Sequence, residues 1–198
     1  TVAGTVANGP GRPSALKPYL IQWLGRYPKW DLQSVWMRIA QTLRPIAKGY
    51  LHAPAALHFY NLWQNVPTSQ PPSHSQLWHQ DSEDRSLLKA FLYLSDVTEG
   101  AGPLHYIPGT HWRGSRTITP QSEVQAFNNT VVARVSDEAM AVVVPREEWR
   151  VATGPVGTLV LADTIGWHKG GYATTQERLV AVWHWVTIDC VYPTRFRP

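Results

Sequence analysis

The first part of the chain carries apolar residues at helical spacing. Between residues 14 and 48 these positions are Leu16, Tyr19, Leu20, Trp23, Leu24, Leu32, Val35, Trp36, Ile39, Leu43 and Ile46. The dipeptide Tyr27-Pro28 interrupts the run, so we expect two helices, with Asp31 as the N-cap of the second. Apolar stripes of this kind indicate helix faces packed on a large apolar surface. Residues 1–13 are rich in Gly, Pro and Ala, and we expect a flexible lead-in there.

After Pro54 the pattern changes to short apolar or alternating runs separated by turn residues. We expect strands at 57–65, 76–81, 87–97, 104–107, 150–153, 157–162, 167–172 and 178–188. The turns between them are short, except for a long stretch of which residues 112–148 are predicted to form a lid or substrate insertion. Helices at 14–48 followed by antiparallel strands over 55–190 are typical of a jelly roll, or double-stranded β-helix, buttressed by N-terminal helices.

The composition fits a single domain over residues 1–198. A chain of 198 residues can bury a sizeable core but is short for two ordinary domains. It holds 10 Trp and 16 Pro with only 16% charged residues, which is typical of β-rich proteins with large side chains between sheets. The net charge of +4 comes from scattered Lys and Arg. This argues against nucleic-acid binding but permits an anionic small-molecule substrate.

The sequence also bears on location and on cysteine chemistry. No apolar run approaches the roughly 20 residues that span a bilayer, so we expect no membrane helix. The first residues lack the charged-then-apolar pattern of a signal peptide. Cys190 is the only cysteine, which excludes an intrachain disulfide and a thiolate zinc site. We therefore expect a cytoplasmic protein in which Cys190 is a small core residue.

The segment Trp78-His79-Gln80-Asp81 contains an H-x-D motif. In a strand, side chains at i and i+2 point to the same face, so His79 and Asp81 can converge on one ion. Imidazole together with carboxylate suits Fe(II), Mn(II) or Zn(II). Alone the motif is weak evidence for a metal site, because a His and an Asp in a surface turn can have the same spacing.

Two later residues strengthen the metal hypothesis. His168 follows an apolar strand, and Arg178 opens the next one. Two His and one carboxylate occupy one face of an octahedral metal and leave three positions for exogenous ligands. A keto-acid co-substrate on those positions needs a cation at its far end, and Arg grips a carboxylate in bidentate fashion. The alternative interpretation of Arg178 is a surface residue that begins an edge strand.

At this point the sequence resembles the phytanoyl-CoA dioxygenase-like branch of the Fe(II)/2-oxoglutarate-dependent oxygenases. The resemblance is carried by His79-Gln-Asp81, by Phe91-Leu-Tyr-Leu-Ser-Asp-Val97, by Gly102-Pro-Leu-His-Tyr-Ile-Pro-Gly-Thr-His111, by His168 and by Arg178. It covers about residues 57–111 and 155–188, and the Gly102–His111 stretch is its most distinctive part.

The resemblance implies a double-stranded β-helix with Fe(II) held by His79, Asp81 and His168. It further implies that 2-oxoglutarate chelates the iron and that Arg178 pairs with its far carboxylate. Phe91 lies where the family often has an aromatic contact. Thr174 or Thr175 is the candidate for a hydroxyl contact, although the segment 169–175 departs from the family's commoner Ser/Asn pattern. The resemblance also implies O2 as the oxidant and succinate and CO2 as co-products.

Several other residues could be mistaken for ligands or substrate contacts. His105 and His184 are interpreted as satisfied core histidines, and His111 as a residue that hydrogen-bonds backbone. Asp84 and Arg85 are either a solvated ion pair, which we favour, or part of the rim of the active site. Trp78 and Trp167 should pack behind the ligand histidines, on the face opposite the metal. The candidates for binding an anionic substrate group are Lys169, Arg113 and Arg116.

These observations favour an Fe(II)/2-oxoglutarate dioxygenase that hydroxylates, or otherwise oxidises, a small molecule. The sequence does not separate hydroxylation from desaturation, ring formation or epoxidation. Asp81 is intact, which disfavours halogenation, because halogenases of this type have Gly or Ala there. Two alternatives from other classes stay open. One is a cupin-like metal enzyme that does not use 2-oxoglutarate, and the other is a non-catalytic jelly-roll binding protein.

Overall fold

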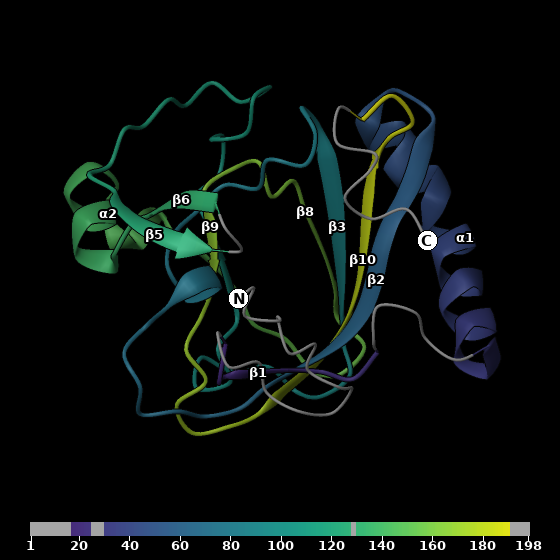
Figure 1. Cartoon of the computed structure of the whole chain (residues 1–198), viewed down its shortest axis with the longest axis horizontal. Helices are drawn as coiled ribbons and strands as arrows, with labels where there is room; N and C mark the ends of the chain where they lie inside the picture. The colour runs from purple at the N-terminus through teal and green to yellow at the C-terminus, as the bar shows by residue number, and fades with distance from the viewer. Residues whose placement is uncertain (1–16, 25–29, 128–129, 191–198) are drawn as a thin grey trace, which may run out of the picture.

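The computed structural model describes residues 17–24, 30–127 and 130–190. They form two antiparallel sheets that face each other, a separate two-stranded sheet, and helices outside these sheets (Figure 1). The larger sheet has the order β1 (Leu20–Gln22), β2 (Ala55–Asn65), β10 (Arg178–Thr187), β3 (Leu87–Tyr93) and β8 (Leu159–Ala162). The smaller sheet has the order β7 (Arg150–Ala152), β4 (Leu104–Tyr106) and β9 (His168–Gly170). The predicted jelly-roll class is confirmed.

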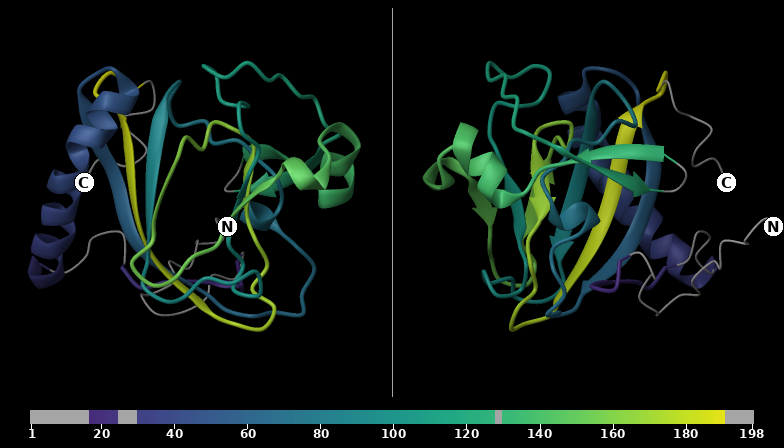
Figure 2. Two further views of the ribbon diagram at one scale, coloured as in Figure 1. Left: turned by 180° about the vertical axis from the view of Figure 1, so that it is seen from behind. Right: turned by 60° about the vertical axis from the view of Figure 1, so that its left-hand side comes forward.

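Strand alternation divides the large sheet into an outer and an inner face. On the outer face, apolar residues of β2, β3 and β10 pack on helix α1 (Trp30–Leu51), which covers the sheet from one side (Figures 1 and 2). Trp36 of the helix lies 4.9 Å from Trp183 of β10, measured between ring centroids. On the inner face, Phe91, Val180 and Val182 contribute to a second core between the sheets. This inner core positions the candidate site.

The N-terminal part differs from the predicted pair of helices. Residues 20–22 form strand β1, which pairs with β2 in the register Leu20↔Asn65. The pairing covers an edge of β2 that would otherwise expose unpaired backbone groups. The second helix exists but begins at Trp30, so Asp31 lies inside it rather than at its cap. The predicted lead-in, residues 1–13, lies outside the described residues.

The predicted strand at 76–81 is also replaced by another structure. A 3-10 turn, η1 (His74–Gln76), comes first, and two isolated bridges follow, Trp78↔Val135 and His79↔His168. The two residues therefore pair with different parts of the chain instead of one continuous ladder. Their side chains still alternate, because Trp78 is fully buried on one side while His79 faces the interior of the barrel.

The long stretch before β7 folds into β5 (Glu123–Phe127), β6 (Thr130–Arg134), α2 (Asp137–Val143) and η2 (Arg146–Glu148), which lie at the periphery (Figure 2). Its apolar residues cluster around Trp78, and Trp167 packs against them, so both Trp side chains lie away from the site as predicted. Asp137 accepts hydrogen bonds from Trp78 Nε1 at 2.8 Å and from Lys169 Nζ at 2.6 Å. The stretch is thus anchored to the neighbours of both ligand histidines.

Candidate metal centre

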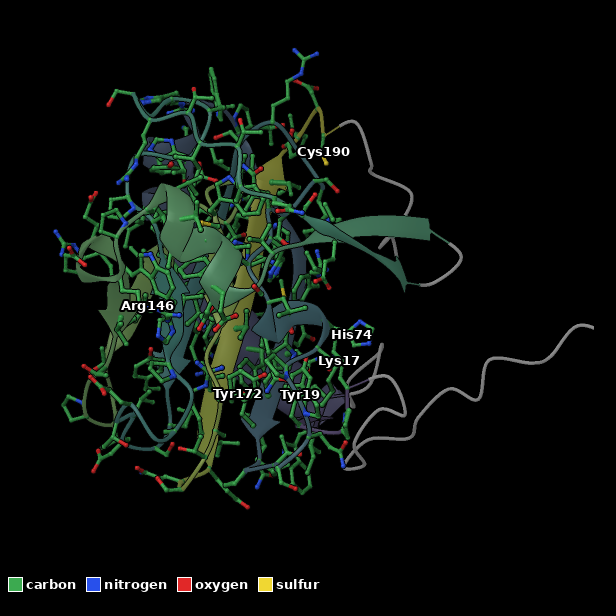
Figure 3. The ribbon with its side chains drawn as sticks, turned by 90° about the vertical axis from the view of Figure 1, so that its left-hand side faces the viewer. Lys17, Tyr19, His74, Arg146, Tyr172 and Cys190 are labelled. Carbon is green, nitrogen blue, oxygen red and sulfur yellow. The ribbon has the colours of Figure 1, made fainter. Side chains whose placement is uncertain are left out.

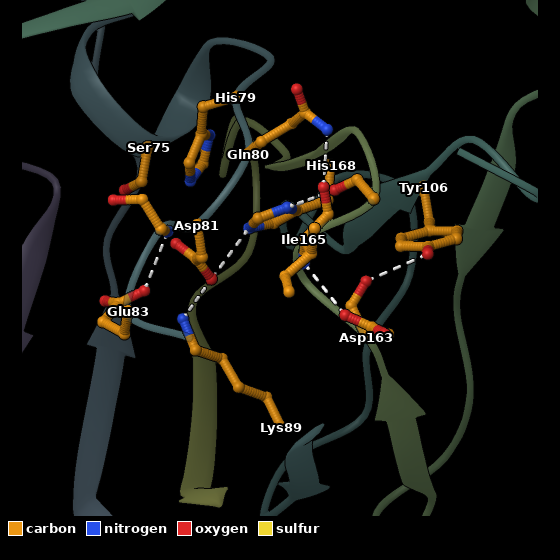
Figure 4. A network of polar contacts seen from close by, with 12 residues as sticks. Ser75, His79, Gln80, Asp81, Glu83, Lys89, Tyr106, Asp163, Ile165 and His168 are labelled. Carbon is orange, nitrogen blue, oxygen red and sulfur yellow. Dashed lines mark hydrogen bonds and ion pairs between the residues drawn. The ribbon is translucent and has the colours of Figure 1, made fainter. Parts of the chain in front are cut away.

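Two His and one Asp from different parts of the chain meet between the sheets. His79 and Asp81 come from the segment before β3, and His168 is the first residue of β9. The bridge between His79 and His168 brings the two histidines together, with ring centroids 4.2 Å apart. One ligand atom from each of the three residues lies within 4.8 Å of the others (Figure 4). This is the spacing that a single metal ion requires.

Backbone carbonyls fix the orientation of both imidazoles. His79 Nδ1 lies 2.7 Å from the carbonyl of Leu77, and His168 Nδ1 lies 2.9 Å from that of Gly166. A carbonyl oxygen can only accept, so Nδ1 of each ring donates and carries the proton. Each Nε2 then keeps its lone pair. Histidines that bind metals are commonly oriented in this way.

Burial and neighbouring charges set the protonation states. Burial lowers the pKa of His168, and it lowers the pKa of His79 well below the usual value. For Asp81, burial opposes ionisation, but Lys89 and the histidines outweigh it and hold the pKa well below its usual range. Neutral histidines beside an ionised carboxylate are the forms that bind a metal, so the donor set fits a divalent ion.

Lys89 of β3 contributes a buried cation to the centre. Its Nζ lies 2.5 Å from Asp81 Oδ2, and only 8% of the residue is exposed. Burial by itself would lower the pKa of Lys89, but Asp81 and Glu83 raise it above the usual value. The ammonium therefore stays charged and holds one carboxylate oxygen, which fixes the rotation of the Asp81 side chain.

The metal ligands open into a cavity of about 290 Å³ that also contains Arg178 and Phe91. Arg178 is 7% exposed, and its Nη2 donates to Asn65 Oδ1 at 2.9 Å. Burial lowers its pKa to about 10, whereas the hydroxyl of Tyr93 raises it. No carboxylate of the described residues forms an ion pair with Arg178. A buried cation with only neutral partners is costly unless a ligand supplies the negative charge.

Thr174 does not reach this cavity. Its side chain is exposed, its backbone N–H donates to the carbonyl of Gly100 at 2.9 Å, and it does not line the cavity. The loop 171–176 packs on the turn around Gly100 instead of folding toward the metal ligands. Asn65 of β2 pairs with Arg178 of β10. In place of Thr174, it is the polar residue beside Arg178.

The three predicted contacts for an anionic substrate are all engaged elsewhere. Lys169 binds both carboxylate oxygens of Asp137 at 2.6 Å. Arg113 donates to the last carbonyls of α1, those of Tyr50 and Leu51. Arg116 forms an ion pair with Glu148 at 2.7 Å. These predictions are wrong, since none of the three side chains lines the cavity of the metal ligands.

The structure corrects the predictions for His184, His111 and Asp84 and agrees with those for His105 and Cys190. His184 is fully buried, but neither ring nitrogen has a hydrogen-bond partner among the described residues, so it is not satisfied. His105 is bonded through Nδ1 to the carbonyl of Pro103. His111 Nδ1 is buried without a partner in the described part of the chain. Asp84 accepts from the backbone and hydroxyl of Thr187, so it anchors the end of β10 rather than forming an ion pair with its neighbour. Cys190 is buried in the core, as predicted.

Sequence reasoning missed several polar residues of this cavity, among them Lys17, Asn65, Lys89 and Arg134. Lys89 could have been found, because it lies two residues before Phe91 and strand alternation places both on one face. Asn65 could have been found only from the register between β2 and β10. Lys17 and Arg134 lie in segments whose position relative to the barrel no local pattern encodes.

A second cavity, of about 420 Å³, lies between β8 and the small sheet. Its walls include Tyr50 and Tyr106. The Tyr50 hydroxyl donates to the carboxylate of Asp163 at 2.7 Å, and the Tyr106 hydroxyl donates to the backbone carbonyl of Asp163 at 2.9 Å. None of the three metal ligands lines it. Although it is larger, its lining offers no metal-binding cluster among the described residues.

Within the described residues, no helix combines the length and apolar character needed to cross a bilayer.

Comparison with solved structures found proteins of the same fold at low identity. The epimerase SnoN, in complex with Fe3+, alpha ketoglutarate and nogalamycin RO, has a TM-score of 0.58 and 16% identity, over 85% of this chain and 62% of its own. EctD from S. alaskensis with bound Fe has a TM-score of 0.55 and 21% identity, over 88% and 58%. HygX from Streptomyces hygroscopicus with nickel and 2-oxoglutarate has 0.54 and 14%, over 86% and 71%. The chain thus spans between 58% and 71% of these proteins' lengths.

In sequence, no curated protein matches the chain. The family model of phytanoyl-CoA dioxygenase (PhyH), however, matches residues 32–180, a span that includes the three candidate metal ligands and Arg178. The chain therefore belongs to the phytanoyl-CoA dioxygenase family.

Proposed function

We propose that the protein is an Fe(II)- and 2-oxoglutarate-dependent dioxygenase that oxidises, most directly by hydroxylation, an unactivated C–H bond of a small molecule. Family membership supports this proposal. So do the iron, nickel and 2-oxoglutarate bound in the solved structures of EctD and HygX. SnoN has the same fold and is an epimerase. The cofactors therefore do not determine the reaction type, and hydroxylation is a separate part of the proposal.

One observation carries the proposal: a buried Arg178 with neutral partners shares a cavity with an intact His-Asp-His cluster. A metal cluster alone suits many enzymes, including those that use no keto acid. The additional cation gives the cavity two poles, a divalent ion at one end and a guanidinium at the other. A dicarboxylate that chelates through its keto-acid end matches both poles.

In this mechanism the chain's own residues bind, orient and exclude water. The iron would be held by Nε2 of His79, Nε2 of His168 and the carboxylate of Asp81. Arg178 would bind the far carboxylate of 2-oxoglutarate and so orient the co-substrate in the cavity. Phe91 forms part of the apolar wall that keeps this region dry. When bound, iron and 2-oxoglutarate convert O2 and the substrate C–H bond into a hydroxylated product, succinate and CO2.

The test is the metal-to-keto-acid charge-transfer band of the Fe(II) protein, recorded anaerobically with 2-oxoglutarate. We expect the band in the unchanged protein. In Arg178→Met the 2-oxoglutarate concentration for half-saturation should rise by at least tenfold, because a charge-assisted bidentate contact is lost. Arg38→Met, which removes an exposed charge on α1, is the matched control and should leave the titration unchanged.

Two results would contradict the proposal. If iron binds stoichiometrically but the band never forms, the protein is a metal enzyme that does not use 2-oxoglutarate. If iron does not bind at all, it is a binding protein of the jelly-roll class. An unchanged 2-oxoglutarate titration in Arg178→Met would overturn the role of that residue even where the band is present.

A further inference from the structure

The cavity of the metal ligands carries more positive than negative side chains. Among the described residues its lining includes the cations Lys17, Lys89, Arg134 and Arg178 and the carboxylates Asp81 and Glu83. The proposed cofactors do not change this balance, since a divalent iron and a dianionic 2-oxoglutarate cancel. Lys89 and Arg178 are offset in number by the two carboxylates Asp81 and Glu83, and both of these carboxylates raise the pKa of Lys89. The excess therefore resides on the side of Lys17 and Arg134.

Arg134, the last residue of β6, reaches this cavity without an acidic partner. No carboxylate of the described residues lies within ion-pair distance of its guanidinium. Its Nε is buried and has no hydrogen-bond partner in the same residues, and Nη1 donates only to the carbonyl of Ala133 at 3.0 Å. Burial lowers the pKa of Arg134, while Asp81 raises it. A guanidinium with vacant donors that faces a cavity fits an oxyanion.

Lys17 adds a second cation close to Arg134. Figure 3 shows Lys17 beside Tyr19 and His74, next to strand β1 and turn η1. Lys17 Nζ donates to Ser75 Oγ at 3.4 Å, a long and weak contact. Burial lowers the pKa of Lys17 to about 8, with repulsion from Arg134 as the next cause. The same two cations lower the pKa of His74, after burial. The region is thus electropositive as a whole.

We propose that the primary substrate carries an oxyanion group, a carboxylate or a phosphate, which Arg134 binds with the help of Lys17. The inference rests on the proposed function, because it places this anion beside the iron and 2-oxoglutarate. Arg134 comes from the predicted substrate insertion and Lys17 from the segment before β1, whereas the metal ligands belong to the barrel. Substrate class is therefore set by elements added around the barrel.

Inorganic phosphate and isotope-labelled acetate are suitable probes for the two anion types. Each is titrated anaerobically into protein loaded with 2-oxoglutarate and either Fe(II) or diamagnetic Zn(II), and the NMR relaxation of the probe is measured. An anion on Arg134 should relax faster in the Fe(II) sample, because the paramagnetic ion is near. In Arg134→Met we expect the affinity for the better probe to fall by at least tenfold. The affinity of Arg134→Lys should lie between those of the unchanged protein and Arg134→Met.

The charge-transfer band recorded in the same samples separates the possible failures. Arg38→Met is the control for a lost positive charge and should bind the probes like the unchanged protein. A normal 2-oxoglutarate band together with probe binding that does not depend on Arg134 would overturn this inference alone. So would displacement of 2-oxoglutarate by the probe, since the anion would then occupy the cofactor's place. A missing band would contradict the proposed function instead.

Discussion

At the residue scale, Asp81 depends on Lys89 for its charge balance. Both side chains are largely buried, and in the metal-free protein Lys89 is the nearest cation to this carboxylate. Removing one partner of a buried ion pair leaves the other charge uncompensated, which costs more than the pair contributes net. A metal ion on Asp81 would supply the missing positive charge. Lys89 is therefore expected to matter most when no metal is bound.

We predict that Lys89→Met lowers the free energy of unfolding of the metal-free protein by about 3 kcal/mol. For a chain of this size the melting temperature should fall by roughly 6–12 °C. Thermal unfolding in the presence of a chelator measures the change, and Lys48→Met, an exposed lysine on α1, is the control. With saturating Zn(II) the difference should shrink. An equal loss with and without metal would show that Lys89 acts through packing rather than through the charge of Asp81.

Also at this scale, the sequence could identify the candidate metal ligands but not the residues that surround them. His79 and Asp81 share a face through alternation alone, without a regular strand. Lys89 and Phe91 obey the same rule. Arg134 and Thr174 do not, because their distance from the metal depends on how a hairpin and a loop pack on the barrel. Thr174, which was expected at the cavity, does not line it, whereas Arg134, which the local pattern does not place there, does.

At the element scale, prediction succeeded where the hydrophobic pattern is long. Helix α1 and strands β2 and β10 each span ten or more residues of consistent periodicity. The segment 19–24 also has helical spacing, yet it forms β1 because β2 offers an unpaired edge. Its Trp23 N–H donates to the carbonyl of Leu62 at 2.9 Å, a contact far away in sequence. Short elements follow such long-range partners more than their own periodicity.

Helix α1 contains Pro45 in its interior, which makes a second prediction possible. Proline lacks the N–H that would bond the carbonyl of Gln41, and its ring crowds that turn. Because Pro45 is exposed, its replacement removes little packing. We predict that Pro45→Ala raises the free energy of unfolding by about 2 kcal/mol, after subtraction of the entropy that the unfolded chain regains.

Urea unfolding of the metal-free protein measures this gain. Thr42→Ala, at another exposed position of the same helix, is the control and should change stability by only a few tenths of a kcal/mol. A loss of stability in Pro45→Ala would contradict the prediction, and it would show that a bend at Pro45 is needed for α1 to follow the twisted sheet.

At the scale of the whole molecule, folding lowers the pKa of histidines in several parts of the structure. The pKa is lowered for six described histidines: His58, His74, His79, His105, His168 and His184. Burial is the largest cause in each case. The unfolded chain takes up protons near pH 6.5, whereas the folded chain does so only at lower pH. Acidification should therefore favour unfolding of the metal-free protein.

His184 is the histidine that tests this without disturbing the metal ligands. Burial, followed by repulsion from Lys89, holds its pKa well below the usual value. Its contribution to stability is complete above the unfolded pKa of about 6.5 and declines as the pH falls below that value. The loss approaches about 1.4 kcal/mol for each pH unit. His184→Leu abolishes this pH-dependent loss of stability. It also removes two buried ring nitrogens that have no hydrogen-bond partner among the described residues.

We therefore predict that His184→Leu flattens the dependence of stability on pH. Between pH 7.5 and 5.5 the unchanged, metal-free protein should lose about 1.4 kcal/mol more than the variant, measured by urea unfolding at both values. His52→Asn, which replaces an exposed histidine with positive φ by a residue that tolerates it, should retain the full dependence. Parallel curves for the unchanged protein and His184→Leu would mean that His184 takes up a proton in the folded state. Its two nitrogens would then have found a partner, and the barrel interior around Lys89 would be wetter than the packing indicates.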